Sequence, residues 1–306
     1  MNEKTQSDYK KLAAHFYKNK LNGEQPTPKR IADALKACAS DYRPAYWRKL
    51  RNALAFDQSD KGYKDAAERI NKTQNPITKD GSKLDVKPKQ KRIKSINSED
   101  EEKLVAEFVK NDDRQSWAAI MLTKHLGARP SEFAEIRVIG DKVFISGAKK
   151  SHGNLRGADR QLTLNAKELG IVKAALGFLK NANVGAVQDR IRAAGKRLWP
   201  QRKSVPSLYS WRHQLGSDLK ASGLNRTDVA YIMGHQSTAS VNVYGNKKTG
   251  SGARSLPMPL SDADLSNIRE VHTSKPPAHA LGQSNEHKAS ASALRTSKFG
   301  ESTLSM

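Results

Sequence analysis

Cysteine and long apolar runs are what this sequence has least of. Its one cysteine, Cys38, cannot form an internal disulfide, and no Cys/His spacing matches a metal site. No run of about 18 apolar residues is present, and the N-terminus lacks a charged-then-apolar signal segment. From these absences we expect a cytoplasmic protein that uses neither a metal nor another cofactor.

Acidic side chains are also scarce relative to basic ones. The 306 residues include 54 Lys and Arg but 31 Asp and Glu, so the net charge is +23. Such a surplus repels itself in the compact state and complements a polyanion. We therefore expect nucleic acid rather than a membrane as the partner, although a basic scaffold protein fits the same composition.

Short amphipathic segments predict an all-helical module over residues 1–74. The segment 41–56 is typical of them, because its apolar residues recur at helical spacing. Its other side carries Arg48, Lys49 and Arg51. These cations can straddle nucleic-acid phosphates, or they can belong to an ordinary solvated helix face.

Residues 75–96 are predicted to be a basic linker. The segment has two prolines, a glycine and little apolar periodicity. Basic linkers are common, but this one has the charge to lie across a nucleic-acid backbone. The candidate DNA-contacting residues in it are Lys87, Lys89, Lys91, Arg92 and Lys94.

Residues 97–250 predict a mainly α domain with a small antiparallel sheet. Alternation of Val143 and Ile145 with polar residues indicates a strand, and residues 160–164 are its expected partner across a polar hairpin loop. Beyond residue 250, Gly, Ser, Ala and Pro dominate the composition. This composition is typical of disorder, and we expect a flexible tail over 251–306 with at most a short helix at 261–271.

The second domain contains side chains suited to phosphoryl transfer without a metal. Attack on a phosphodiester puts charge on the non-bridging oxygens, which arginine and histidine can neutralise. Arg129 and Arg212 are each predicted at the beginning of a helix, where the helix dipole also favours an anion. Tyr244 offers a phenol as nucleophile, and a lysine of the predicted hairpin, Lys149 or Lys150, can protonate the departing oxygen.

The order and spacing of these residues resemble the tyrosine recombinase, or phage integrase, family. The matching pieces are Arg129 within LGARPSEFAEIR, the hairpin lysines, Arg212-His213 within YSWRHQLGSDLKASG, Gly234-His235 within IMGHQS, and Tyr244 nine residues after His235. The likeness covers residues 93–246, roughly the second domain. It implies a two-domain DNA clamp, with a helical core-binding domain followed by the recombinase catalytic domain.

The resemblance also implies a role for each matching residue. Tyr244 would attack the scissile phosphate and hold the 3′ end covalently, so that ATP is not needed. Arg129 and Arg212 would clamp the phosphate, and His235 would donate a hydrogen bond to it. Lys149, favoured slightly over Lys150 by the strand alternation, would be the general acid.

Three further residues have supporting positions in this scheme. Glu132 would orient Arg129, and His213 would pack behind the site. The family commonly has histidine three residues before the second arginine, but this chain has Tyr209 there. A phenol can still donate a hydrogen bond to a phosphate, but it is a poor general base near neutral pH.

The function implied is site-specific DNA strand exchange that integrates or excises a mobile element. The implied assembly is a homotetramer on two specific duplex sites in the bacterial nucleoid, with accessory DNA-bending or directionality factors as possible partners. Two alternatives remain open at this stage. One is a type IB topoisomerase-like enzyme that relaxes DNA as a monomer, and the other is a non-catalytic DNA-binding or architectural protein on the same fold.

Overall fold

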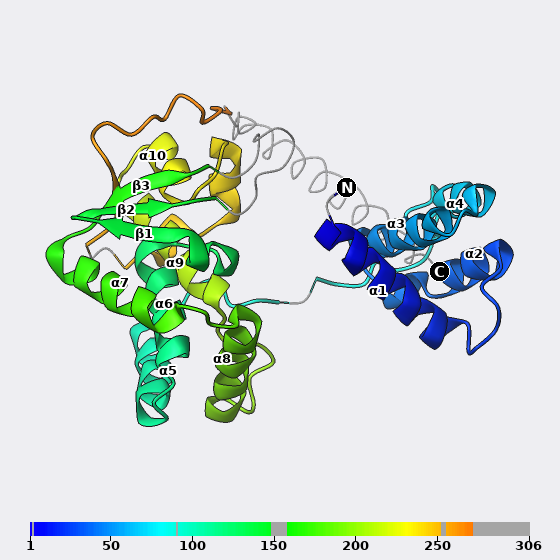
Figure 1. Ribbon diagram of the computed structural model, residues 1–306, viewed down its shortest axis with the longest axis horizontal. Helices are drawn as coiled ribbons and strands as arrows, with labels where there is room; N and C mark the ends of the chain where they lie inside the picture. The colour runs from blue at the N-terminus through cyan, green and yellow to red at the C-terminus, as the bar shows by residue number, and fades with distance from the viewer. Residues whose placement is uncertain (2, 90, 148–157, 252–254, 272–306) are drawn as a thin grey trace, which may run out of the picture. The chain divides into compact units, whose positions relative to one another are not determined.

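The computed structural model describes residue 1 and residues 3–89, 91–147, 158–251 and 255–271. The chain forms two compact units, Met1–Lys91 and Arg92–Met306 (Figure 1). The hairpin lysines Lys149 and Lys150 lie outside the described residues, and so does the part of the predicted tail from 272 onward.

The first unit is helical because its apolar residues recur on one face of each segment. Its helices are α1 (Glu3–Lys20), α2 (Pro28–Ala37), α3 (Pro44–Asp60) and α4 (Lys64–Asn71). Phe16, Leu35, Trp47 and Ile70 are among the residues that form its core. The Trp47 indole N–H donates to the Leu35 carbonyl over 2.7 Å, which satisfies the one polar atom of this buried ring.

Both ends of the segment predicted as a linker, 75–96, are packed. Ile77 belongs to the core of the first unit, and Ile96 belongs to the core of the second. The backbone N–H of Ile96 also donates to the side chain of Gln214 over 3.3 Å. An apolar residue near each end therefore anchors the segment, and most of the residues between them are exposed.

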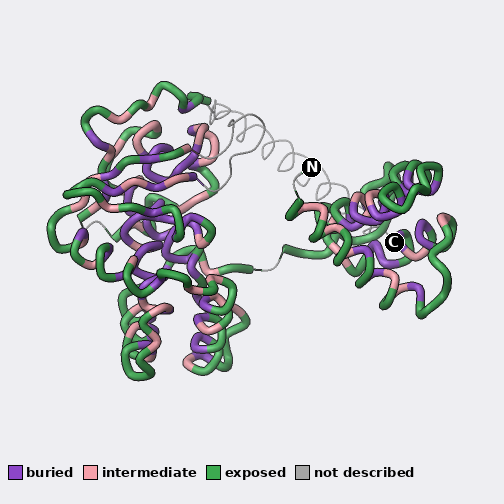
Figure 2. The backbone as a smooth tube through the Cα atoms, in the orientation of Figure 1, coloured by how far each residue is buried: buried purple, intermediate pink, exposed green. Residues whose placement is uncertain are grey.

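The second unit is built around a central helix. Its helices are α5 (Ser98–Lys110), α6 (Arg114–Leu126), α7 (Ala166–Leu179), α8 (Val184–Leu198), α9 (Leu208–Ala221) and α10 (Arg226–Ile232). Helix α6 contacts α5, α7, α8 and α9, and buried residues gather around it (Figure 2). It ends at Gly127, whose left-handed backbone (φ 59°) turns the chain toward Arg129.

A four-stranded antiparallel sheet completes this unit, with strand order β1-β2-β3-β4. The strands are β1 (Ile136–Ile139), β2 (Lys142–Ile145), β3 (Arg160–Thr163) and β4 (Met258–Pro259). Val143 pairs with Leu162 and Ile145 with Arg160, and all four side chains are buried. The predicted fold class, mainly α with a small antiparallel sheet, is confirmed.

The segment 261–271, which we expected to be flexible tail with at most a short helix, forms turns and no helix. The Asp264 carboxylate accepts hydrogen bonds from both the backbone N–H and the hydroxyl of Ser266, and such local bonds compete with helix formation. The segment is also not free of the domain. Ile268 is buried in its core, and Arg269 exchanges backbone hydrogen bonds with Gln236 and Thr238.

Candidate active site

Arg129 is fixed by a carboxylate three residues along the chain. It precedes a short 3-10 helix, Pro130–Glu135, in which Glu132 accepts from the Arg129 backbone N–H (2.9 Å) and from its Nη1 (2.6 Å). Its Nη2 donates to the carbonyl of Gly234 over 3.2 Å. Arg129 is thereby tied both to its own turn and to the residue before His235.

A third buried arginine, Arg160 on β3, shares the same carboxylate. Its Nη2 donates to Glu132 over 2.9 Å, and the side chain is 1% exposed. Burial alone would raise the pKa of Glu132, but Arg160 and Arg129 together lower it to about 2. Sequence reasoning missed Arg160, although its place on the strand face that also carries Leu162 was a signal.

Arg212 is fully buried and lies close enough to Arg129 and Arg160 to interact with them electrostatically. It is the fifth residue of α9 and not at the beginning of the helix as we expected, so backbone carbonyls rather than the helix end surround it. Its guanidinium donates to the carbonyls of Gly127 and Met233. Burial, together with Arg129 and Arg160, lowers its pKa to about 9, which leaves it charged at neutral pH.

His235 is buried next to Arg212 and is neutral. Burial and the nearby arginines lower its pKa to about 2. Its Nε2 lies 3.3 Å from the Arg212 Nη2, which always donates, so the ring proton is assigned to Nδ1. That Nδ1 is buried and bonds to none of the residues that the structure describes, so among them it is the free donor of the ring.

Gly234, the residue before His235, has to be a glycine for two reasons. Its φ of +60° lies in the left-handed region, and a Cβ there would come within 2.6 Å of the Arg160 Nη1. The backbone at Gly234 is therefore packed directly on the arginine cluster.

Tyr244 closes the site from the end of a 3-10 helix, Thr238–Val243. Its ring centroid lies 5.0 Å from the Arg212 guanidinium carbon and 5.0 Å from the His235 ring. The ring also stacks on His213, with 4.8 Å between the ring centroids. Four residues that are spread over 115 positions of the sequence, Arg129, Arg212, His235 and Tyr244, thus meet in one place.

His213 holds the residue after the tyrosine. Its Nδ1 accepts from the backbone N–H of Gly245 over 3.3 Å, which requires an unprotonated Nδ1. Burial and nearby cations, first Lys94 and then Arg212, lower the His213 pKa to about 4. His213 therefore stays neutral near pH 7 and packs behind Tyr244.

Other candidate residues are distributed differently. Tyr209 is 38% exposed on the first turn of α9, with no side-chain hydrogen bond to the described residues. In the first unit Arg48 and Arg51 line one groove with Lys79, whereas Lys49 is exposed and outside it. Of the linker cations, Lys87 donates to the Asp41 carbonyl, while Lys94 and Arg92 act electrostatically on His213.

Two other kinds of site are absent from the described residues. They contain no group of three or more His, Cys, Asp or Glu side chains placed to hold a metal ion. None of the described helices combines the length and the apolar character that a membrane span needs.

The sequence matches no protein-family model and no curated protein. Solved structures do match. A lambda integrase tetramer bound to a Holliday junction aligns at 15% identity with a TM-score of 0.54, over 83% of this chain and 75% of that chain. A Tn1549 transposon integrase in complex with a circular intermediate DNA aligns at 13% identity and 0.52, over 80% and 90%. The chain has the lambda integrase fold.

That fold is the one implied by the sequence resemblance to tyrosine recombinases. A lambda integrase dimer bound to a COC′ core site aligns comparably, at 15% identity with a TM-score of 0.53, over 83% of this chain and 74% of that chain. At such identities the likeness establishes the fold. The chemistry has to be argued from the residues of this chain.

Proposed function

We propose that the chain is a site-specific DNA recombinase that cleaves and rejoins strands through a covalent bond between Tyr244 and a 3′ phosphate. The observation that carries this proposal is the position of the Tyr244 ring, against the buried guanidinium of Arg212 and the free-donor imidazole of His235. A phenol in this setting is a nucleophile beside a ready-made site for a phosphate.

The charge balance of the site supports an anionic substrate. Arg129 and Arg160 are paired with Glu132, while Arg212 donates to carbonyls, so the positive charge exceeds the negative charge in a buried place. Uncompensated buried charge is costly. A phosphodiester supplies the missing negative charge, and the further charge that develops on its oxygens during attack is stabilised more strongly still.

The reaction follows from these positions. The Tyr244 oxygen bonds to phosphorus and gives up its proton to solvent as the bond from phosphorus to the 5′ oxygen breaks. Arg129 and Arg212 bind the non-bridging oxygens, and His235 donates its Nδ1 proton in a hydrogen bond to one of them. The 5′ oxygen takes a proton from Lys149 or Lys150. Because the phosphotyrosine conserves the energy of the bond, a 5′-hydroxyl can reverse the step on a new partner without ATP.

The wider setting is part of the same proposal. The structural neighbours include a tetramer on a Holliday junction and a transposon integrase, which supports strand exchange between two duplexes during movement of a genetic element. Two duplexes must each be cut on both strands, and four tyrosines meet this need. We accordingly propose a homotetramer on two specific sites in the nucleoid, with the helical residues 1–74 binding DNA beside the catalytic domain.

A covalent trap tests the chemistry. Wild-type protein is incubated with a nicked suicide duplex taken from the flanks of the element that carries the gene, and SDS-resistant protein–DNA adducts are counted. We expect an adduct with wild type and none with Tyr244→Phe, while the exposed Tyr63→Phe control keeps it. Absence of a wild-type adduct, or an equal adduct with Tyr244→Phe, favours a non-catalytic DNA-binding protein.

A second assay separates recombination from relaxation. The same protein is given a supercoiled plasmid with one site and a plasmid with two. Recombinant products that need both sites are the expected result. Efficient relaxation of the one-site plasmid by monomeric protein would instead indicate topoisomerase-like activity.

A further inference from the structure

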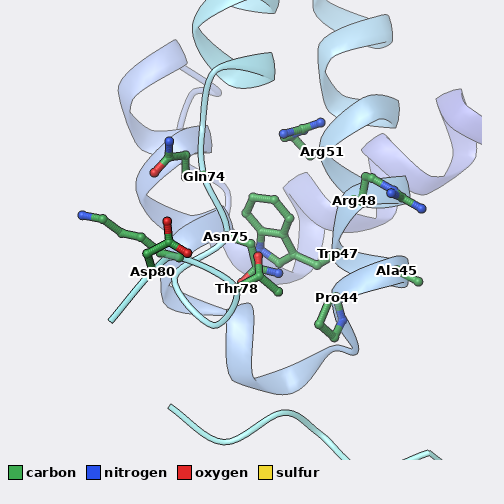
Figure 3. A pocket seen from close by; sticks show the side chains of 10 residues that line it. Pro44, Ala45, Trp47, Arg48, Arg51, Gln74, Asn75, Thr78 and Asp80 are labelled. Carbon is green, nitrogen blue, oxygen red and sulfur yellow. The ribbon is translucent and has the colours of Figure 1, made fainter. Parts of the chain in front are cut away.

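A groove of about 680 Å³ opens on the first unit, far along the chain from the candidate active site. One wall is the beginning of α3, with Pro44 and Arg48, and the other is the turn 74–80. In Figure 3 the indole of Trp47 lies between the two arginines of α3 on one side and the segment with Asn75 on the other. Trp47 is 2% exposed and is held by its hydrogen bond to Leu35, so this part of the groove is rigid.

Asn75 lines this groove and carries a buried donor that no described residue accepts from. The residue is 7% exposed. Its Oδ1 accepts from the backbone N–H of Ile77 over 2.9 Å, and its carbonyl accepts from Thr78 and Lys79, so both the side chain and the turn are fixed. Its Nδ2, however, has no hydrogen-bond partner among the described residues. Buried donors are almost always satisfied, and an unsatisfied one at a groove indicates a ligand with an acceptor oxygen.

The charges around Asn75 indicate that this acceptor is anionic. Arg48, Arg51 and Lys79 line the groove, against the one carboxylate of Asp80 among its lining residues. Arg51 is only loosely engaged: its guanidinium reaches oxygens of Thr73 and Asn52 at 3.4 Å, and its buried Nε has no partner in the described part of the chain. The beginning of α3 adds the positive end of a 17-residue helix to the same place.

We propose that this groove is a phosphodiester-binding site through which the first unit holds DNA. The amide of Asn75 donates to a non-bridging oxygen, and Arg48, Arg51 and Lys79 neutralise the phosphate. A base carbonyl would satisfy the amide but would leave the three cations without a counterion. DNA as the source of the phosphodiester rests on the proposed function, whereas the groove's preference for an anion does not.

The proposed site distinguishes between cations that look equivalent in the sequence. Arg48 lines the groove, while its neighbour Lys49 on the same helix does not. The two residues have the same charge and both are exposed, so they form a matched pair. The groove also recruits Lys79 and Asn75, which the sequence places in a linker.

The first test changes one atom of the ligand contact. In full-length protein, Asn75→Asp keeps the oxygen that accepts from Ile77 but replaces the free donor with a charged acceptor. Binding to duplex DNA is measured by fluorescence anisotropy across a salt series, in a Tyr244→Phe background that cannot cleave. We expect Asn75→Asp to weaken binding at least tenfold, with an unchanged thermal unfolding midpoint.

The matched pair supplies the second test. Arg48→Ala should weaken binding and reduce the slope of log affinity against log salt by about one, as loss of one phosphate contact requires. Lys49→Ala should leave that slope nearly unchanged. Equal losses for the two substitutions, or wild-type binding by Asn75→Asp, would overturn the proposed groove.

Methylphosphonates, which are uncharged replacements for a phosphate, test whether the groove binds the DNA backbone. Single methylphosphonates are placed along the DNA site. At one position the replacement should weaken DNA binding by the protein whose groove is unaltered. At that position it should cause no further loss of binding by the Arg48→Ala variant. Equal losses in both proteins at every position would refute the assignment, as would failure of the protein to bind DNA. Because all these assays use the non-cleaving background, they succeed or fail independently of the suicide-substrate trap.

Discussion

The Lys220 ammonium donates to the backbone carbonyl of Tyr244 over 2.5 Å and to that of Gly245 over 2.9 Å. Helix α9 therefore carries both Arg212, on which the tyrosine ring rests, and the lysine that holds the tyrosine's backbone. One rigid helix thus positions the proposed nucleophile relative to the phosphate site. Small displacements of a reacting group slow a reaction strongly. We therefore expect Lys220 to affect the cleavage rate without contacting DNA.

Lys220→Met should slow adduct formation about tenfold or more, in line with the cost of misplacing a reacting group. Single-turnover kinetics at saturating suicide duplex measure this rate. Anisotropy measures the affinity for DNA, which should stay within about twofold of wild type because Lys220 faces the backbone of Tyr244. Lys220→Arg, which keeps a donor, should restore part of the rate. The exposed Lys248→Met is the control. A parallel loss of affinity and rate would show that Lys220 contacts DNA instead.

Gly245 lets the chain after Tyr244 lie directly on α9. Its φ is +69°, and a Cβ there would come within 2.3 Å of the Ser217 backbone nitrogen. Gly245→Ala should therefore displace Tyr244 and reduce the adduct rate by about two orders of magnitude, the scale of a roughly 1 Å misplacement. Gly223 is a close control, since it has φ +86° but open space around its Cβ position. Gly223→Ala should cost stability, by about 1 kcal/mol, and leave cleavage intact.

If Gly245→Ala and Gly223→Ala reduce cleavage to the same extent, backbone strain rather than docking explains the effect. Unfolding midpoints for both variants are needed to make this comparison. Because of the steric overlap at Gly245, we expect Gly245→Ala to reduce cleavage far more than Gly223→Ala does.

Docking on the chain's own α9 also predicts which subunit each tyrosine serves. In a mixture of Tyr244→Phe protein and Arg212→Lys protein, no single chain has both an intact Tyr244 and an intact Arg212. The two residues can meet in one site only if a tyrosine enters the site of a neighbouring subunit. Because Gly245 and Lys220 hold Tyr244 beside Arg212 of the same chain, we expect no recovery of adduct on mixing. Lysine keeps the charge of Arg212 but lacks the fork that binds two oxygens. An adduct in the mixture, on the Arg212→Lys chain, would demonstrate cleavage in trans.

Tyr209 should contribute modestly. It lies one helical turn before Arg212, and the residue is 38% exposed. Its hydroxyl is bound by none of the described residues and can donate to a phosphate. Tyr209→Phe should lower the single-turnover cleavage rate by about threefold to tenfold, as for loss of one hydrogen bond of about 1 kcal/mol. Tyr209→His should equal or exceed wild type. An unchanged rate in Tyr209→Phe would mean that the hydroxyl plays no part.

The sequence predicted the features whose signals are local or ordered along the chain. Alternation in 142–145 predicted β2 and its pairing with β3, and the ordered spacing of Arg212, His235 and Tyr244 predicted that they act together. Arg160 escaped notice because the strand alternation places it on the face of Leu162 but does not show which side chain it meets. Its role depends on Glu132, which lies 28 positions away.

Tertiary contacts explain the remaining differences between the structure and the predictions from the sequence. The segment 261–271 has a composition typical of a tail, yet Ile268 is buried and Arg269 pairs with the loop that follows His235. The helix-terminal position expected for Arg212 was also wrong. Helix α9 begins four residues earlier, at Leu208, and carbonyls of two other segments, at Gly127 and Met233, hold the guanidinium. Neither relationship leaves a pattern in the sequence around the residue concerned.

The Glu132 carboxylate should make the stability of the protein pH-dependent in a defined window. Its pKa is about 2 in the folded chain against an ordinary value of 4.5, because Arg160 and Arg129 outweigh the effect of burial. A lowered folded-state pKa gives stability that is complete above about pH 4.5 and is lost as the pH falls toward 2. Glu132→Gln should therefore cost about 3 kcal/mol at pH 7, the size of a broken buried ion pair, and progressively less below pH 4.5. Denaturant unfolding of both proteins between pH 3 and 7 measures the difference, with the exposed Glu102→Gln as control. A difference that stays constant over this range would show that shape, and not the charge shared by Arg129 and Arg160, is what Glu132 contributes.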